Sequence, residues 1–527
     1  MTRRVMLATS RGRSVTFFES LLVLLAIAIL LLQASRRMAI PYPTMLAAAG
    51  VVLALVPGAP RIDLDPHTVL ALFVAPVLVD AAFDFPVGAV RRLWRPLFAL
   101  AVVAVLLSAG AVAWLGVALA GLPLFAALAL GAIVAPPDAA AATAILRSVS
   151  MPRRSVDVLK GESLLNDATA LLLFGAAVSF QSRGGMDGGL ALQVALAAPG
   201  AVLLGIVLAK LLRLVMPYVT GTLGGNLFEF VTCIGAWILA ERLGLSAVLC
   251  LVAFAMTIAR TANLSIRPRI RIHSFAVWGT AVFLLNVLAF LLMGLQARTI
   301  VGGMPTERLY EAAWFALAVI LCLVLVRMAW VLAYVRLANR FHALGGAEPP
   351  PTRREAVLIG WCGMRGLVSL ATAFALPADF PQRDLIVLTA FAVVLATLIV
   401  QGLTLAPLVR LLGLDGEGGV TGELASGRAE LAAAALAALE GRSGPAADHW
   451  RHSFEAARAA ASPSGDPAAL DAKRALGLVA LRRQRERLEQ LRGVRQVGPE
   501  AFLILQEELD FLEVSLSDEA DRRIEQS

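Results

Sequence analysis

Long apolar segments alternate with short polar stretches over residues 17–412. Because a helix needs about 20 predominantly apolar residues to cross a bilayer, this pattern predicts about thirteen spans, centred near residues 24, 48, 74, 106, 135, 169, 202, 234, 252, 287, 323, 366 and 398. The first run, 16–32, follows a basic N-terminus and resembles a signal peptide. It is also long enough to span, and we expect it to be retained in an all-α polytopic membrane protein.

Two of the predicted spans are interrupted. The fifth, 124–146, has Pro136 and Pro137 at its middle, directly before Asp138. Proline removes a backbone donor and clashes with the preceding turn, so two in succession should open the helix. In the twelfth span, Gly363 and Gly366 flank an arginine. Paired interruptions in two halves of a transporter indicate inverted repeats around a midplane site, so we expect spans four to six and eleven to thirteen to be related.

The pattern changes after residue 412. Residues 413–527 are rich in Gly, Glu and Ala, and their apolar residues recur at helical spacing near 422–440, 449–460, 467–491 and 499–518. We therefore predict a transmembrane domain over 1–412 and a soluble helical tail over 413–527. A scaffold, dimerisation or regulatory role of the tail is equally compatible with the sequence.

Composition and charge place the chain in a membrane. Hydrophobic residues make up 59% of the chain and charged residues 16%, against about 25% charged in soluble domains. The net charge of +8 is concentrated in the loops of the first domain, which indicates contact with anionic lipid and not with nucleic acid. If the chain lies in the cell membrane with its tail in the cytoplasm, most of the loop arginines and lysines lie on the cytoplasmic side. The basic N-terminus would then lie outside the cell.

One apolar segment contains two carboxylates, Glu162 and Asp167. An ionisable side chain at the bilayer centre costs roughly 3 kcal/mol even on lenient scales, so it normally faces a bundle interior or an ion path. On a helix Ser163 shares a face with Asp167, whereas Glu162 points away from it. We therefore expect Ser163 and Asp167 to face a site and Glu162 to face another helix.

These residue types suit a monovalent cation. A hard cation binds several oxygen ligands, and Asp167, Asp138, Ser163 and the carbonyl groups at Pro137 supply them. A carboxylate enclosed by protein binds either a proton or a cation, so the two compete for it. That competition would couple the flow of one ion to the flow of the other.

Three further charges lie in or near apolar segments. Arg327 stays protonated at any ordinary pH, so it requires a carboxylate or water. Asp80 lies near the end of the third span. Arg365 either orients the broken twelfth span or offsets helix-end dipoles.

The chain resembles the monovalent cation/proton antiporters of the sodium/proton exchanger type, in the group with an Asn-Asp motif. The block Gly-Glu-Ser-Leu-Leu-Asn-Asp at 161–167 is the most specific part of the likeness. The likeness covers most of 17–412 and is supported by residues 41–43, 135–138, Asn286, Phe290, Gly294, Arg327, 363–369 and 401–408.

The resemblance implies a dimeric thirteen-span fold with inverted repeats and two crossed, broken helices. It implies that Asp167 exchanges a proton for sodium and that Asp138 and Ser163 help to bind the ion. It pairs Glu162 with Arg327 as a structural ion pair. Asn166 stands where related electrogenic antiporters have a second aspartate, which implies electroneutral exchange. Two departures are Pro137, where relatives commonly have threonine, and Asp80, where glutamate is frequent.

Three functions are compatible with these residues. The first is a sodium or lithium/proton antiporter for pH and sodium homeostasis. The second is a potassium/proton antiporter, because ligand type alone does not fix cation size. The third is a cation channel or a non-transporting sensor. The sequence contains no phosphate loop, nucleophile triad or metal motif, so we expect neither an enzyme nor a bound cofactor.

Overall fold

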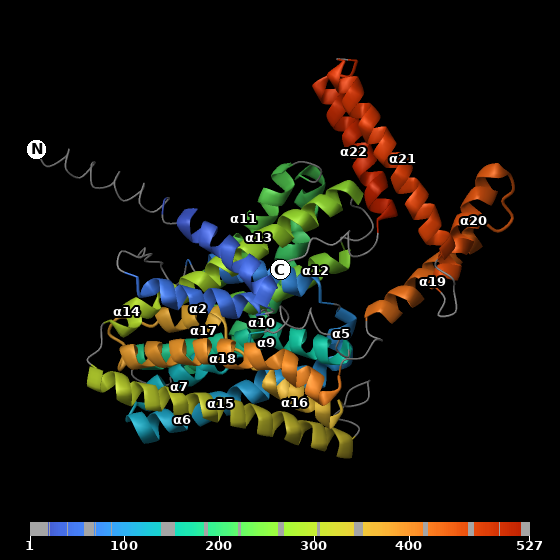
Figure 1. The fold of residues 1–527 in the computed structure, drawn as a ribbon. Coiled ribbons are helices and arrows are strands. Elements are labelled where there is room, and N and C mark those ends of the chain that lie inside the picture. Colours follow the sequence, from blue (N-terminus) through green and yellow to red (C-terminus); the bar gives the residue numbers. More distant parts are fainter. Residues whose placement is uncertain are drawn as a thin grey trace, which may run out of the picture. The chain divides into compact units, whose positions relative to one another are not determined.

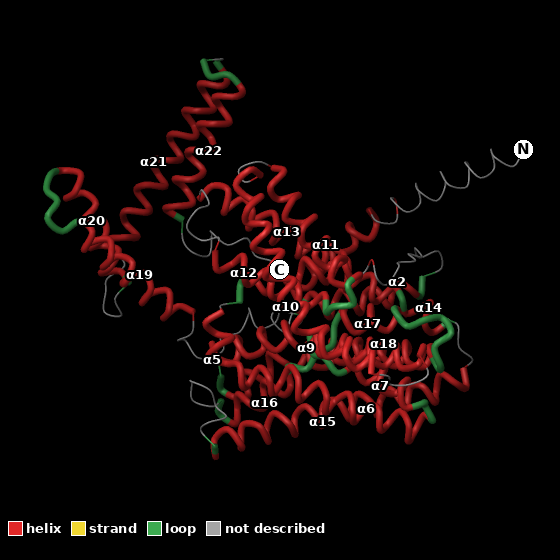
Figure 2. Tube along the Cα trace, turned by 180° about the vertical axis from the view of Figure 1, so that it is seen from behind, coloured by secondary structure: helices red, strands yellow, loops and turns green. Residues whose placement is uncertain are grey.

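The chain divides into two compact units in a computed structural model, Met1–Asp415 and Gly416–Gln526. The structure describes residues 19, 22–38, 40–56, 68, 70–85, 87–138, 153–183, 188–219, 223–261, 268–302, 306–341, 351–414, 420–461, 468–494 and 496–517. The regular structure within these ranges is helical throughout (Figures 1 and 2). Part of the predicted first span, 16–18 and 20–21, lies outside the described residues.

The first unit begins with helical residues 22–38. Its further helices are α2 (Tyr42–Ala54), the π-helical segment η1 (Leu70–Val74), α4 (Ala75–Phe83), α5 (Val87–Phe98), the π-helical segment η2 (Ala99–Ala104), α6 (Val105–Ala120), α7 (Leu124–Val134), α9 (Arg153–Arg183), α10 (Gly188–Val219), α11 (Leu223–Arg242), α12 (Ala247–Thr261), α13 (Pro268–Leu295), α14 (Ala297–Val301), α15 (Thr306–Arg340), α16 (Arg353–Trp361), α17 (Leu367–Phe374) and α18 (Arg383–Leu412).

Six of the described helical stretches are long and apolar enough to cross a membrane: Gly88–Ala120, Arg154–Gln181, Ala195–Met216, Pro268–Leu295, Leu309–Arg340 and Arg383–Leu412. The predicted centre near 366 falls between α16 and α17, and the centre near 135 falls directly after the end of α7. The rest of the predicted fifth span, 139–146, lies outside the described residues. The remaining predicted centres fall within helical residues. The all-α class is therefore confirmed, and the count of thirteen crossings stays a prediction.

The helices of the first unit pack in two groups. The core bundle consists of α5–α7, α9 and α15–α18, in which α6 lies against α7 and α15, and α15 against α16 and α18 (Figure 1). The panel consists of α2, α4 and α10–α13, in which α12 contacts α4, α10 and α11, and α13 contacts α2. Small residues allow the close approach: a Cβ on Gly131 in α7 would lie 2.9 Å from the Ala109 Cα in α6.

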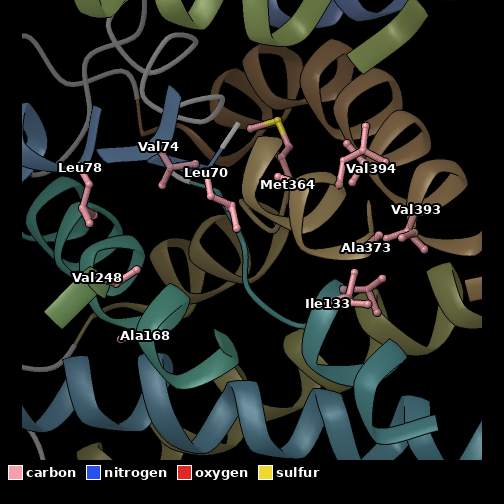
Figure 3. Close-up of a cluster of buried hydrophobic side chains, with 14 of the residues drawn as sticks. Leu70, Val74, Leu78, Ile133, Ala168, Val248, Met364, Ala373, Val393 and Val394 are labelled. Atoms are coloured by element: carbon pink, nitrogen blue, oxygen red, sulfur yellow. The ribbon is translucent and has the colours of Figure 1, made fainter. Parts of the chain in front are cut away.

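Apolar side chains surround the end of α7 and the stretch between α16 and α17. Figure 3 shows Ile133 from α7, Met364 from the stretch after α16, and Val394 from α18 in one buried cluster. Ala168, the neighbour of Asp167, belongs to the same cluster. The polar groups near these two places are therefore embedded in a packed apolar interior.

The second unit contains four helices, α19 (Val420–Ala438), α20 (Pro445–Ala460), α21 (Ala468–Gly493) and α22 (Pro499–Leu516). α19 packs on α20, and α21 on α22. Each agrees with a tail helix expected from the apolar spacing to within a few residues.

Candidate ion-binding site

The two interrupted helices meet at their breaks. α7 ends at Val134, and the two prolines that follow it prevent the next turn from forming. α16 ends at Trp361, and α17 begins only at Leu367. The backbone N–H of Asp138 donates to the Met364 carbonyl at 2.6 Å, so the unwound segment of one helix is bonded to that of the other.

Arg365 binds the carbonyl ends of both half-helices. Its side chain is 1% exposed. The Nε atom donates to the Val134 carbonyl at 3.0 Å, Nη2 lies 3.5 Å from the Ala135 carbonyl, and Nη1 donates to the Gly363 carbonyl. A cation at carbonyl-rich helix ends is stabilised by their partial negative charge. These contacts are compatible with both roles that the sequence left open, which are to orient the break and to offset the helix-end dipoles.

Gly366 allows the two breaks to come this close. A Cβ built on Gly366 would overlap the carboxylate of Asp138. Any larger residue would push Asp138 out of its position, so glycine is required by space at this point and not by its backbone angles.

Asn166 connects α9 to the same crossing. Its Nδ2 donates to the Pro137 carbonyl at 2.6 Å, whereas Oδ1 is buried and has no hydrogen-bond partner among the described residues. Buried polar atoms are usually satisfied. The amide oxygen is thus an unused acceptor, and the Pro137 carbonyl, expected from sequence to face an ion, already accepts one hydrogen bond.

Asp167 and Ser163 lie one turn apart on α9, and both are half-buried. Asp138 is also half-buried, and its carboxylate is near enough to that of Asp167 for their charges to repel. Asp138, Asn166 and Asp167 are therefore brought together at the crossing.

Glu162 faces away from this group and binds Arg327 of α15. Arg327 Nη1 lies 2.5 Å from Oε1 of Glu162, and Nη2 lies 3.0 Å from Oε2. The same Nη2 also donates to the carbonyls of Ile359 and Cys362 at 3.1 and 3.3 Å. This bidentate pair links α9 and α15 to the end of α16.

Asp80 lies in the last turn of α4, in the panel. α4 also contacts α9, the helix that carries Asp167. A part for Asp80 in ion binding stays a prediction.

Two polar features were not anticipated from the sequence. The Thr397 hydroxyl of α18 accepts the backbone N–H of Arg365 at 3.0 Å. Glu229 of α11 accepts from Trp278 Nε1 at 2.6 Å and from the Ser274 hydroxyl at 3.1 Å. Glu229 was detectable, because it is a lone carboxylate in an apolar segment, as Asp167 is.

A cavity of about 270 Å³ lies beside α9 on the Leu171 side, one turn beyond Asp167. Its walls come from α9, the panel and α17, and they include Leu171, Phe174, Trp237, Glu241 and Thr372. Among the described residues no three His, Cys, Asp or Glu side chains form a group that fits a resident metal.

The family described as sodium/hydrogen exchanger, transmembrane, matches residues 22–411. An Na⁺/H⁺ exchanger of Mycobacterium tuberculosis is 30% identical over 511 residues, which cover 91% of this chain and 92% of the relative. A sodium, potassium, lithium and rubidium/H⁺ antiporter of Bacillus pumilus is 30% identical over 394 residues, covering 69% of this chain and 57% of the relative.

A solved structure has a similar fold. The sodium proton antiporter MjNhaP1 of Methanocaldococcus jannaschii at pH 8 aligns with a TM-score of 0.57 and 16% identity, covering 75% of this chain and 99% of that one. At this identity the likeness shows the fold alone. Together with the family match, it leads to one conclusion: the chain belongs to the sodium/hydrogen exchanger family of membrane antiporters.

Proposed function

We propose that the chain exchanges sodium or lithium for a proton at Asp167, one for one and without net charge transfer. The observation that carries the proposal is the crossing itself. It brings Asp138, Asn166 and Asp167 together where two helices are unwound. Unwound backbone at membrane depth is tolerated where it is buried in protein or lines a water-filled cavity.

Oxygen atoms supply the ion ligands. The carboxylates of Asp167 and Asp138, the Ser163 hydroxyl and the unpartnered Asn166 Oδ1 are hard ligands of the kind that sodium and lithium bind. Binding a cation relieves the repulsion between Asp138 and Asp167, and so does protonation of either one. The cation and the proton therefore replace one another.

Charge counting supports the stoichiometry. Asn166 is neutral, so Asp138 and Asp167 are the only carboxylates that the described residues place at the crossing. With Asp138 ionised in both states, Asp167 exchanges one proton for one monovalent cation. The Glu162–Arg327 pair is internally neutral and bidentate, so it has a structural role. Arg365 holds the two breaks together.

The proposal extends to the arrangement of the helices around the site and to the assembly of the chain. We propose inverted repeats formed by α6–α7–α9 and by α15–α16/α17–α18, since each places an interrupted helix between two others. We further propose a homodimer in the cell membrane, with residues 413–527 as a cytoplasmic tail of regulatory function. Asp80 and Pro137 have secondary parts, Asp80 from the panel and Pro137 through its carbonyl.

Potassium/proton exchange is the second candidate. The Bacillus pumilus relative is named for sodium, potassium, lithium and rubidium, and oxygen ligands accept each of these ions. A channel is disfavoured, because selectivity filters use repeated rings of ligands, whereas the described residues here form one asymmetric site.

The test measures proton movement across proteoliposomes with a pH-sensitive dye, in Na⁺, Li⁺ and K⁺ in turn and over a pH series. We expect Na⁺ and Li⁺ to drive exchange, with an apparent KM for the cation that rises as pH falls. The variant Asp167→Asn should fold and show no exchange. Asp379→Asn, at an exposed loop carboxylate, is the matched control and should exchange normally.

Three results would contradict the proposal. Exchange retained by Asp167→Asn would exclude Asp167 from the mechanism. A strong response of the rate to an imposed membrane potential would contradict electroneutrality. Exchange driven by K⁺ but not by Na⁺ would favour the second candidate.

A further inference from the structure

In the second unit, α21 and α22 form an antiparallel helical hairpin. Its inner face contains Leu488 and Phe502, which are 6% exposed. The Arg492 guanidinium lies over the Phe502 ring at 4.4 Å, and Arg485 binds Asp510 at 2.5 Å across the two helices. These contacts fix the register of the hairpin.

The outer face of the hairpin also carries exposed apolar side chains. Ile504 and Phe511 of α22 are seven residues apart, so they share a face, and Ile504 lies two residues from Phe502, almost on the opposite side of the helix. Leu476 of α21 is 73% exposed. The exposed large apolar residues of the hairpin include Leu476, Val479, Leu503, Ile504, Phe511, Leu512 and Val514.

The two helices carry opposite charge. α21 contains seven basic and three acidic residues, and α22 contains five acidic residues and no basic one. In a two-fold pair of hairpins whose axis runs parallel to the helices, each α21 faces the α22 of the other copy. Such an arrangement buries the apolar outer faces and sets basic against acidic helices. An anionic lipid surface would attract α21 but repel α22.

We propose that the α21–α22 hairpin is an interaction surface for the same hairpin of a second copy of the chain, forming a four-helix bundle. Four-helix bundles of this kind bury apolar faces that two helices alone leave exposed. Two copies held in one membrane would meet at high effective concentration, so a modest contact would suffice. The inference does not depend on which cation is transported.

The first test is cross-linking of the full chain in membranes. Ile504→Cys and Phe511→Cys are treated with a short bismaleimide, and the covalent dimer is measured on a denaturing gel. We expect a yield roughly tenfold above that of Ala434→Cys, an exposed position in α19 outside the hairpin. The parent chain sets the baseline, because its four cysteines lie in the first unit.

The second test reverses charge. In the Ile504→Cys background, Arg483→Glu with Arg487→Glu on α21 should lower the cross-linked yield roughly tenfold through like-charge repulsion. Glu500→Lys with Glu508→Lys on α22 should do the same. Co-expression of the two reversed chains, carrying different affinity tags, should restore cross-linking in the mixed pair only. Unchanged ion exchange would show that each chain is folded.

Cross-linking of Ile504→Cys and Phe511→Cys no higher than that of Ala434→Cys would overturn the proposal. So would charge reversal without effect, or a mixed pair that is not restored. Cross-links from the hairpin to the first unit in place of a second copy would assign this face to a contact within the chain.

Discussion

Each of the two units contains an arginine that is paired with carboxylates. The pair in the first unit is buried, and the pair in the second unit is partly exposed to solvent. Arg327 and Glu162 are 3% and 1% exposed, and Arg327 also donates to the Ile359 and Cys362 carbonyls. Arg485 of the tail lies between Asp510 and Glu513 with 35% of its side chain exposed. Water already solvates the second arginine when its partners leave, whereas the first has no such alternative. The same chemistry therefore has a large structural effect in one unit and a small one in the other.

The largest difference is expected on removing one partner of the buried pair. Arg327→Ala leaves the Glu162 carboxylate uncompensated, which should lower the free energy of unfolding by about 3–5 kcal/mol. Thermal unfolding of the purified protein in detergent measures this. The double variant Arg327→Met, Glu162→Met should regain much of the loss, because no buried charge remains. A single variant as stable as the parent would show that water reaches the pair.

The crossing should be the next most sensitive feature, and glycine tests it. Gly366→Ala places a methyl group on the Asp138 carboxylate, so we expect ion exchange to fall by about tenfold or more, equivalent to about 1.4 kcal/mol. The matched change in the tail is Gly427→Ala in α19, where a Cβ meets no atom within 4 Å. That variant should gain up to about 1 kcal/mol of helix stability and exchange ions normally.

A change from glycine to alanine is therefore expected to lower ion exchange at Gly366 and to raise helix stability at Gly427. Ion exchange by Gly366→Ala at the parent rate would mean that Asp138 moves aside without consequence, and it would remove Asp138 from the proposed ion ligands. A loss of exchange in Gly427→Ala would instead couple the tail to transport.

The two units also differ in how much the sequence alone revealed. Apolar spacing located the tail helices, since their boundaries depend on local pattern and on capping. The prolines and glycines of the sequence predicted both interruptions of the membrane helices, because these residues change the conformation of their own backbone. The cost of a buried charge identified Asp167, Glu162 and Arg327. These are local rules, and each one applied within a single segment.

Beyond the pairs that carboxylate and arginine chemistry and the resemblance indicated, the sequence did not reveal which backbone groups meet. Two partners of the Arg365 side chain are the carbonyls of Val134 and Ala135 at the end of α7, some 230 residues earlier in the chain, and carbonyls carry no sequence signal. The acceptor role of Thr397 and the bond from Asn166 to Pro137 are equally invisible before the helices are packed. Glu229 was missed for a different reason, since the rule that found Asp167 also applies to it.

The smallest effect is expected at the exposed tail pair. The hydrogen bond from Arg485 to Asp510, with a second to Glu513, holds the pKa of the guanidinium above its ordinary value. A raised pKa of a basic group stabilises the fold below that pKa and is lost only as pH rises through it, which is above any working pH. Arg485→Ala should therefore cost less than about 1 kcal/mol, with no pH dependence from the arginine itself.

Salt separates the two pairs most cleanly. Exposed charges are screened over about 10 Å at 0.1 M salt, and buried ones far less. Hydrogen exchange of α21–α22 in the full chain should thus show that the difference in protection between the parent and Arg485→Ala shrinks in high salt. The loss of stability that Arg327→Ala shows in thermal unfolding should persist in high salt. Arg482→Ala, at an exposed neighbour in α21, controls for loss of charge alone. If the Arg485 effect were large and independent of salt, the pair would be shielded from water.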